Sequence, residues 1–216
     1  TASSETANPA QAVLFNHSTV DVGMVYLPVD MTMKHLTSTF GEGTSASIST
    51  LPYAHSQSQN FIPDLHAIVP LNNHYYFTFG VTVPDGLKSD WNAGSWKEGA
   101  AYDLSTYSSI KVIDINPGFA YQISPHWSVA VGGNVLYGQA DYNAVSQALT
   151  NPDAQDEISN RMKGTAYDWN AGVLYMPFKG TRIGLGFRSS YHLHATGPST
   201  VKGGDAPLVT PTTAST

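Results

Sequence analysis

Charged side chains are scarce in this chain. Only 12% of its 216 residues are Asp, Glu, Lys or Arg, whereas soluble domains contain about 25%. Long apolar runs are also missing: none approaches the roughly 18 residues that a membrane-spanning helix needs, and the mean hydropathy is −0.17. A transmembrane β-barrel fits both shortages, because its apolar residues alternate with polar ones. A soluble β-sandwich also fits composition alone.

Cysteine is absent too, and positive charge is scarce, with 10 Lys and Arg residues against 16 Asp and Glu. The absence of cysteine excludes a disulfide framework and thiol catalysis. The net charge is −6, and no basic stripe is present to neutralise phosphates, so we expect no nucleic-acid partner. The chain opens on Thr1 without a charged-then-apolar leader. We therefore expect either that a leader has been removed or that the chain is a piece of a longer protein.

What the sequence does contain is alternation with a period of two, clearest over residues 182–195. One face of this segment carries Ile183, Leu185, Phe187, Tyr191 and Leu193. The other carries Arg182, Gly184, Gly186, Arg188, Ser190, His192 and His194. A strand with this pattern has one apolar face and one polar or small-residue face. Barrel walls need this pairing, with the apolar face toward lipid and the other toward a lumen.

About seven such strands are predicted, at residues 19–32, 61–69, 75–83, 113–123, 127–138, 167–175 and 182–195. Their connections alternate between short (71–74, 124–126, 177–181) and long (34–60, 84–108, 143–164). Aromatic residues cluster near the short connections, as in an interfacial girdle: Tyr75, Tyr76, Tyr121, Trp127, Tyr175 and Phe178. The predicted fold class is all-β, an antiparallel transmembrane β-barrel with short periplasmic turns and long outer loops.

Charged residues fall on the strand faces opposite the aromatic ones. Among them are Asp114, Asp168 and Arg188. An unpaired charge in a narrow lumen is costly, so we expect Arg188 to pair with Asp168 or Asp114. A structural network of ion pairs is favoured over a direct role in handling substrate.

Several motifs, in order, resemble the FadL-type outer-membrane transporters of long-chain fatty acids and other hydrophobic compounds. Asn8-Pro9-Ala10 is similar to the Asn-Pro-Ala that ends the family's N-terminal plug. The wall segments that carry the resemblance are 25–28 (VYLP), 63–73 (PDLHAIVPLNN), 81–87 (VTVPDGL), 169–175 (WNAGVLY) and 187–189 (FRS). Each is weak alone, but the ordered set is specific.

The resemblance implies a barrel of about fourteen strands with a small hatch inside. The chain then supplies about half of it and is expected to be a fragment. Residues 1–18 would be the end of the plug and the lead-in, 19–195 strands one to seven, and 196–216 a flexible outer-loop tail. The complete barrel is expected to be a monomer in contact with the lipid of the bacterial outer membrane.

The resemblance also implies a route: capture by outer loops, binding in the lumen, and lateral exit beside an inward kink in the third strand. Pro84, Gly86 and Leu87 stand where that kink lies. Proline removes a ladder donor and glycine permits a bend. An ordinary strand end is the alternative.

Candidate ligand-binding residues lie in the long loop 143–164 and at the outer end of the fifth strand just before it. Val145 and Leu149, then Ile158 and Met162, have i,i+4 spacing on either side of residues 151–152, which predicts two short amphipathic helices like the family's capture loop. A solvated loop with a few buried anchors is the alternative. The family's basic residue at the outer end of the fifth strand has no match in 141–144, although Ala140 and Tyr142 could line an apolar pocket. The ligand is then a long-chain fatty acid whose cation comes from the missing half, or a neutral hydrophobe.

Enzyme and metal chemistry find little support. His192 and His194 share a strand face, but no third metal ligand is in view. No Gly-x-Ser-x-Gly elbow marks a hydrolase nucleophile. We expect no catalytic residue, no metal and no cofactor. Transport of hydrophobic molecules is the predicted function, with an adhesin or receptor acting through its loops, or a barrel lipid hydrolase, as alternatives.

Overall fold

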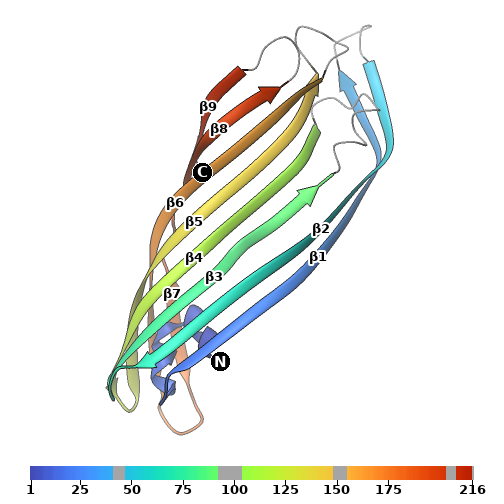
Figure 1. The fold of residues 1–216 in the computed structure, drawn as a ribbon. Coiled ribbons are helices and arrows are strands. Elements are labelled where there is room, and N and C mark those ends of the chain that lie inside the picture. Colours follow the sequence, from blue (N-terminus) through green and yellow to red (C-terminus); the bar gives the residue numbers. More distant parts are fainter. Residues whose placement is uncertain (41–46, 92–103, 148–154, 203–207, 216) are drawn as a thin grey trace.

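One antiparallel sheet, curled into an open half-barrel, forms most of the computed structural model (Figure 1). The structure describes residues 1–40, 47–91, 104–147, 155–202 and 208–215. The strands are β1 (Thr19–Phe40), β2 (Ser47–Pro70), β3 (Tyr75–Asp90), β4 (Leu104–Ser124), β5 (Trp127–Gln147), β6 (Gln155–Tyr175), β7 (Ile183–Arg188), β8 (His194–Lys202) and β9 (Leu208–Ser215). Two 3-10 helices, η1 (Ala2–Thr6) and η2 (Pro9–Leu14), precede them. The predicted fold class is confirmed.

The sheet runs in sequence order, with β7 and β8 sharing one place in the wall. Both pair with β6, β7 along Asn170 to Tyr175 and β8 along Glu157 to Lys163. They therefore form the seventh position of the barrel wall, and β9 begins the eighth.

Several predicted strand ends were wrong, because the strands continue well into the expected long loops. The β1–β2 ladder, for example, runs without a break from Thr19↔Ile68 to Lys34↔Tyr53 and ends at Phe40↔Ser47. The prediction relied on a continuous apolar face, and polar residues such as Lys34 and Ser38 interrupt that face. Backbone hydrogen bonding does not need it, so the ladder goes on through a mixture of polar and apolar residues.

The tail predicted for residues 196–216 was also wrong as a loop. β8 and β9 pair from His194↔Ser215 to Val201↔Leu208. This segment is rich in Thr, Val and Ser and poor in large apolar residues. Its composition is therefore typical of a loop, while its β-branched residues suit a polar strand outside the membrane.

The alternation over residues 182–195 is interrupted in space. Ile183, Leu185 and Phe187 lie on the exposed outer face, as predicted. Between β7 and β8 the chain leaves the ladder at 189–193, and the phase of the alternation changes. Leu193 consequently packs inward on a cluster of Val112, Leu136 and Ala166, which corrects its predicted outward position.

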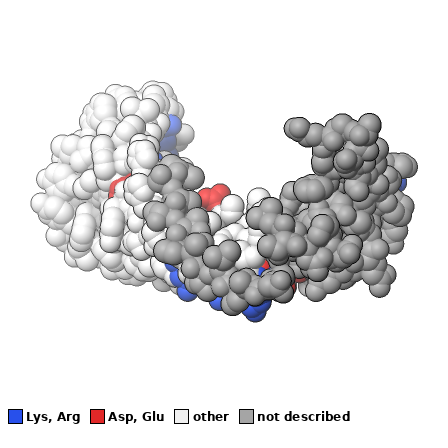
Figure 2. Space-filling model, turned by 90° about the horizontal axis from the view of Figure 1, so that it is seen from above, with Lys and Arg blue, Asp and Glu red and all other residues white. Residues whose placement is uncertain are grey.

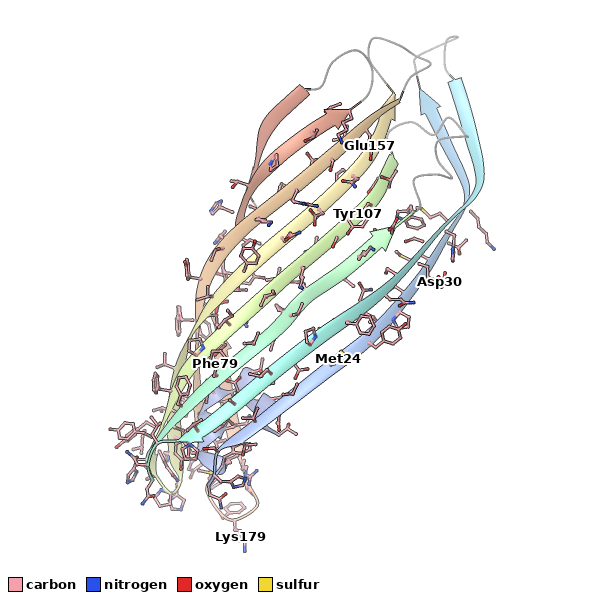
Figure 3. The ribbon with its side chains drawn as sticks, in the orientation of Figure 1. Met24, Asp30, Phe79, Tyr107, Glu157 and Lys179 are labelled. Carbon is pink, nitrogen blue, oxygen red and sulfur yellow. The ribbon has the colours of Figure 1, made fainter. Side chains whose placement is uncertain are left out.

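The two faces of the wall differ as a barrel requires. Large apolar residues are exposed on the outside, Leu185 at 75% and Tyr167 at 72%. The inner face buries polar residues such as Asn134 and Asp168. Figure 3 shows Met24 and Phe79 part-way along the wall, Tyr107 and Glu157 toward its outer end, and Lys179 at the tip of the β6–β7 turn. No helix among the described residues is long and apolar enough to cross a membrane.

The predicted aromatic girdle is mostly present. Trp127 stacks on Tyr175 with ring centroids 4.3 Å apart, and the Tyr75 and Tyr121 rings lie 4.8 Å apart. Tyr76 is the exception: it is 6% exposed and belongs to the inner core, which η1 and η2 build against the short-turn half of the wall. Neighbouring strand residues point to opposite faces, so Tyr75 and Tyr76 cannot both face lipid.

Candidate functional site: the lumen and an opening in the wall

The β2–β3 ladder stops part-way up the wall. It runs from Pro70↔Tyr76 to Leu65↔Val81 and ends there, and the register of β3 against β4 shifts between Thr82 and Asp85. Farther up, side chains bridge the two strands again. Ser58 Oγ donates to the Lys88 carbonyl oxygen at 2.7 Å, and the Asp90 amide donates to Ser56 Oγ at 2.9 Å. An opening is thus framed by residues 59–64 of β2 and 82–87 of β3.

The predicted kink residues lie in this opening. Pro84 has no N–H to offer β2, and Gly86 follows the register shift. Leu87 is 63% exposed at the edge of the opening. The sequence therefore located the interruption; the part these residues play in transport stays a prediction.

A cavity of about 180 Å³ occupies the opening and crosses the wall. Its lining includes Phe61 on the outer face, where that ring packs on Tyr26. It also includes Asn60, which points inward and is 8% exposed. Residues of both faces therefore line one space, so the wall is not continuous there.

Apolar lumenal cavities adjoin the opening. One of about 320 Å³ is lined by Val29, Met31, Leu87, Lys88, Ser89, Ser108 and Ile110. Another, of about 200 Å³, is lined by Ile110, Val112, Gly138, Gln139, Ala140, Met162, Leu193 and Ala195. Ile110 lines both of these and the cavity in the opening. The three spaces are therefore neighbours along one path. The two lumenal cavities are mostly apolar, whereas the cavity in the opening also has polar lining residues such as Gln59, Lys88 and Lys111.

Two of the predicted ligand-binding residues line this path together. Ala140 and Met162 are cross-strand partners in the β5–β6 ladder and line the 200 Å³ cavity. Tyr142 follows on the same face of β5 and is 39% exposed. Ile158 lies farther out on β6, opposite Ala144.

The two predicted helices were wrong where the structure tests them. Val145 lies in β5, and Ile158 and Met162 lie in β6; Leu149 falls outside the described residues. Residues i and i+4 share a face in a strand as well as in a helix. The spacing alone therefore could not separate the two structures.

The sequence prediction missed several residues of the lumenal cavities, among them Ile110, Val112 and Leu193. Leu193 is the one displaced by a change of phase. Its side chain lies over Gly138, where an added Cβ would overlap Leu193 Cδ2. The His194 carbonyl lies over Gly164 in the same way. Glycines on the lumenal faces of β5 and β6 thus give the seventh strand room to bend inward, and they were the one available signal.

The predicted lumenal ion pair has the expected geometry. Arg188 Nη2 lies 2.7 Å from Asp114 Oδ2 and 2.8 Å from Asp168 Oδ2, and Arg188 Nε also donates to Asp168. Both carboxylates are buried. Asn134 extends the network by donating to Asp168 and accepting from Asn116. One guanidinium therefore joins β7 to β4 and β6 across the lumen.

The Asn8-Pro9-Ala10 motif anchors the N-terminal segment on the inner face. Asn8 Oδ1 accepts from the Ala10 amide at 3.0 Å as the N-cap of η2, and Asn8 Nδ2 donates to the Val173 carbonyl at 2.9 Å. Pro9 occupies the first helical position, where no N–H is needed. Ser128 Oγ of β5 donates to the Ala10 carbonyl at 3.0 Å.

A buried polar contact holds η1 as well. Glu5 is 1% exposed, and its Oε1 lies 3.1 Å from His66 Nδ1 on β2. His66 pairs with Gly80 of β3, next to the end of the β2–β3 ladder. The N-terminal segment is therefore attached directly beneath the opening.

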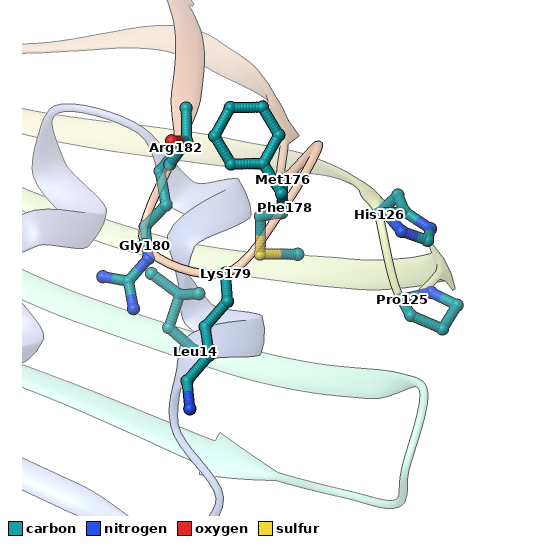
Figure 4. A pocket seen from close by; sticks show the side chains of 9 residues that line it. Leu14, Pro125, His126, Met176, Phe178, Lys179, Gly180 and Arg182 are labelled. Carbon is teal, nitrogen blue, oxygen red and sulfur yellow. The ribbon is translucent and has the colours of Figure 1, made fainter.

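A further cavity of about 310 Å³ lies at the short-turn end (Figure 4). It is lined by Leu14, Pro125, His126, Met176, Phe178, Lys179, Gly180, Thr181 and Arg182. It contains none of the predicted site residues and shares no lining residue with the lumenal path.

Metal ligation has no support in the described part of the chain. No group of three or more His, Cys, Asp or Glu residues is placed there to hold an ion. His192 lies in the break and His194 begins β8, so the alternation that put them on one face does not persist.

An apolar exterior, a polar lumen and a curved antiparallel wall define this protein as part of an outer-membrane β-barrel. The family model described as "Outer membrane protein transport protein (OMPP1/FadL/TodX)" matches residues 1–216. The chain belongs to that family of outer-membrane proteins.

Relatives of known name agree with this assignment. The long-chain fatty acid transport protein of Escherichia coli (strain K12) is 25% identical over 212 residues, covering 84% of this chain and 44% of that protein. Outer membrane protein P1 of Haemophilus influenzae (strain Rd) is 26% identical over 232 residues, covering 88% and 48%. The chain thus spans about half the length of these curated relatives.

Solved structures show the same fold. A Pseudomonas aeruginosa FadL homologue superposes with a TM-score of 0.69 at 12% identity, covering 91% of this chain and 49% of that one. The toluene transporter TbuX of Ralstonia pickettii gives 0.67 at 14% identity, covering 100% and 58%.

Proposed function

We propose that the full-length protein carries hydrophobic small molecules, above all long-chain fatty acids, across the outer membrane. The ligand is captured at the outer loops, binds in the apolar cavities of the lumen, and leaves sideways through the opening between β2 and β3. One observation carries the proposal. Ile110 lines the two lumenal cavities and also the cavity that crosses the wall.

A lateral exit suits an apolar cargo on physical grounds. Exposing an acyl chain to water costs about 0.8 kcal/mol per CH₂. A route from the lumen through the wall leads into the hydrocarbon layer, so this cost is avoided. Residues of η1 and η2 pack against the inner face of the wall at its short-turn end, and this position supports the proposal that they obstruct the route toward the periplasm.

The relatives' names support both fatty acids and aromatic compounds as cargo. Within the described residues, the lumenal Arg188 already holds two carboxylates. Lys88, which lines one of the lumenal cavities and the cavity in the opening, lies 3.7 Å from Asp90. We propose that the cation for a fatty-acid carboxylate comes from the part of the barrel beyond this chain. The closed barrel is proposed to act as a monomer, because closure satisfies the backbone groups of its edge strands.

The test replaces the residues that interrupt the ladder. In the full-length protein, Pro84→Thr together with Gly86→Val restores a donor and a β-branched residue, so β3 should straighten against β2. We expect uptake of labelled oleate to fall at least tenfold. Gly133→Ala serves as the control, since an added Cβ there meets no atom within 4 Å.

Uptake of a neutral aromatic compound, measured in the same cells, assigns the cargo. Loss of oleate uptake supports fatty-acid transport, whereas loss of aromatic uptake alone would replace the fatty acid by a neutral ligand. If both ligands enter at the control rate while the double variant is folded, the lateral exit is wrong.

A further inference from the structure

The outward apolar belt ends at the same height on three adjacent strands. On β5 the outward aromatic and aliphatic residues run from Trp127 to Tyr137, a length that matches the about 9–11 residues of a membrane-spanning strand. The next outward residue is Gln139. The corresponding outward residues on the neighbouring strands are Lys111 of β4 and Lys163 of β6, which both pair with Gln139.

The following outward row is charged as well. It joins Ser109, Asp141 and Arg161 across the same strands. Arg161 Nε donates to Asp141 Oδ1 at 2.8 Å, and Gln139 Nε2 donates to Asp141 Oδ2 at 2.8 Å. The two rows therefore hold three cations and one acid, and that acid is engaged.

The lysines of the first row stay available. Lys111 and Lys163 are exposed, and no carboxylate of the described residues lies within 4.0 Å of either ammonium group. Seen from above, one group of Lys and Arg atoms is visible along the lower, convex edge of the wall (Figure 2).

The cationic rows continue onto β3 but not onto β1 and β2. Lys88 of β3 pairs with Ser109 and so extends the second row, and its ammonium lies 3.7 Å from Asp90. At the corresponding place on β1 and β2, the outward residues are Asp30 and His55, which pair with each other at 2.8 Å, and the neutral Gln57 and Gln59. Lys111 and Lys163 differ from Lys88 because neither has an acidic partner within 4.0 Å among the described residues.

We propose that Lys111, Lys163 and Arg161 bind the phosphate groups of an anionic lipid headgroup in the outer leaflet. We choose a lipid as the ligand because the apolar belt lies directly below these cations. Tyr137 and Tyr167 of that belt are 41% and 72% exposed, and in the membrane they would contact the acyl chains of the same lipid. Lys111 and Lys163 stand two strands apart, about 10 Å at the strand spacing of a sheet. A headgroup with more than one phosphate can reach both.

The test measures lipid retention, so it does not depend on whether the protein transports anything. The full-length protein is purified, and native mass spectrometry is used to titrate it with a diphosphorylated glycolipid and with the same lipid after dephosphorylation. Lys111→Gln with Lys163→Gln should weaken binding of the phosphorylated lipid about fivefold per lysine. Lys179→Gln, an exposed lysine at the opposite end of the wall (Figure 3), is the matched control and should bind as the wild type does.

Folding of each variant is checked by its heat-dependent gel mobility. Equal binding of both lipids by the wild type, or equal retention by the double variant and the control, would overturn the site. Competition by inorganic phosphate at the concentration of the lipid would also overturn it, because the site would then be one for a free anion.

Discussion

Arg188 is the residue on which the polar lumen depends. Its guanidinium lies between Asp114 and Asp168, whose side chains are 3% and 0% exposed. Arg188→Met would leave two carboxylates unpaired in a dry environment. Breaking a buried pair in this way costs on the order of 3 kcal/mol. We expect the urea midpoint of the full-length protein to fall accordingly.

Arg161→Gln is the comparison for that experiment. Arg161 also pairs with an aspartate, but its side chain is 67% exposed on the outer face. Exposed pairs contribute about 0–1 kcal/mol, so this variant should unfold close to the wild-type midpoint. Equal losses for the two arginine variants would show that the lumenal network adds nothing beyond a surface pair.

Glu5 should make the attachment of η1 depend on pH. Burial raises the pKa of the Glu5 carboxyl above its usual 4.5; contacts with His66 and Thr78 oppose the shift, and the charge of Asp114 adds to it. The attached helix then binds the proton more tightly than the released one. Its contribution is fully present below pH 4.5 and is lost as the pH rises through the raised pKa.

Hydrogen exchange of residues 2–14, corrected for the intrinsic effect of pH, measures this directly. Protection should decrease as the pH rises above about 4.5. Glu5→Gln keeps a polar side chain without the titration, so its protection should not follow pH in that window. The same pH profile in variant and wild type would assign the effect to another group.

At the scale of the elements, alternation predicted where strands lie but not where they end. It placed the faces of Phe187 and Arg188 correctly, because each step along a strand reverses the side. It failed at Leu193, where the chain leaves the ladder for a few residues and the phase is lost. It also failed toward the outer strand ends, where polar pairs such as Thr37↔Thr50 alternate with apolar ones such as Leu36↔Leu51 and no continuous pattern marks how far the ladder extends.

The N-terminal segment lies close to the wall because the residue beneath Asn8 is a glycine. A Cβ on Gly172 of β6 would overlap Asn8 Oδ1. Gly172→Ala must therefore push the Asn8 side chain away from the wall. This removes the N-cap of η2 and the hydrogen bond from Asn8 to the Val173 carbonyl. We expect the segment to detach and the ion conductance of the full-length protein in planar bilayers to rise.

Gly133→Ala provides the comparison on the neighbouring strand, because an added methyl group there meets no atom within 4 Å. Its conductance should equal that of the wild type. If Gly172→Ala also leaves the conductance unchanged, the segment does not obstruct the lumen.

At the scale of the whole molecule, the path through the wall could not be derived from the sequence. Pro84 and Gly86 marked the interruption, but the cavity there needs Phe61 of β2 and Ile110 of β4 beside them. The register between strands sets those neighbours, and no local pattern encodes it. The same holds for the row that brings Lys111 and Lys163 to either side of Gln139.

The height of the whole wall in the membrane can be tested with two tryptophans. Trp127 stacks on Tyr175 at the short-turn end of the belt, whereas Trp169 lies farther along β6 and is 50% exposed on the outer face. At a strand rise of 3.4 Å and a tilt near 45°, the two indoles differ in depth by roughly 14 Å.

In full-length variants that retain one tryptophan, lipids brominated deep in the acyl chain should quench Trp169 most, and lipids brominated near the headgroup should quench Trp127 most. The reverse order, or quenching of Trp169 by aqueous iodide, would mean that the outward aromatic face is not the lipid-facing belt. The lateral exit and the headgroup site would then both be wrong, because each assumes that this face contacts lipid.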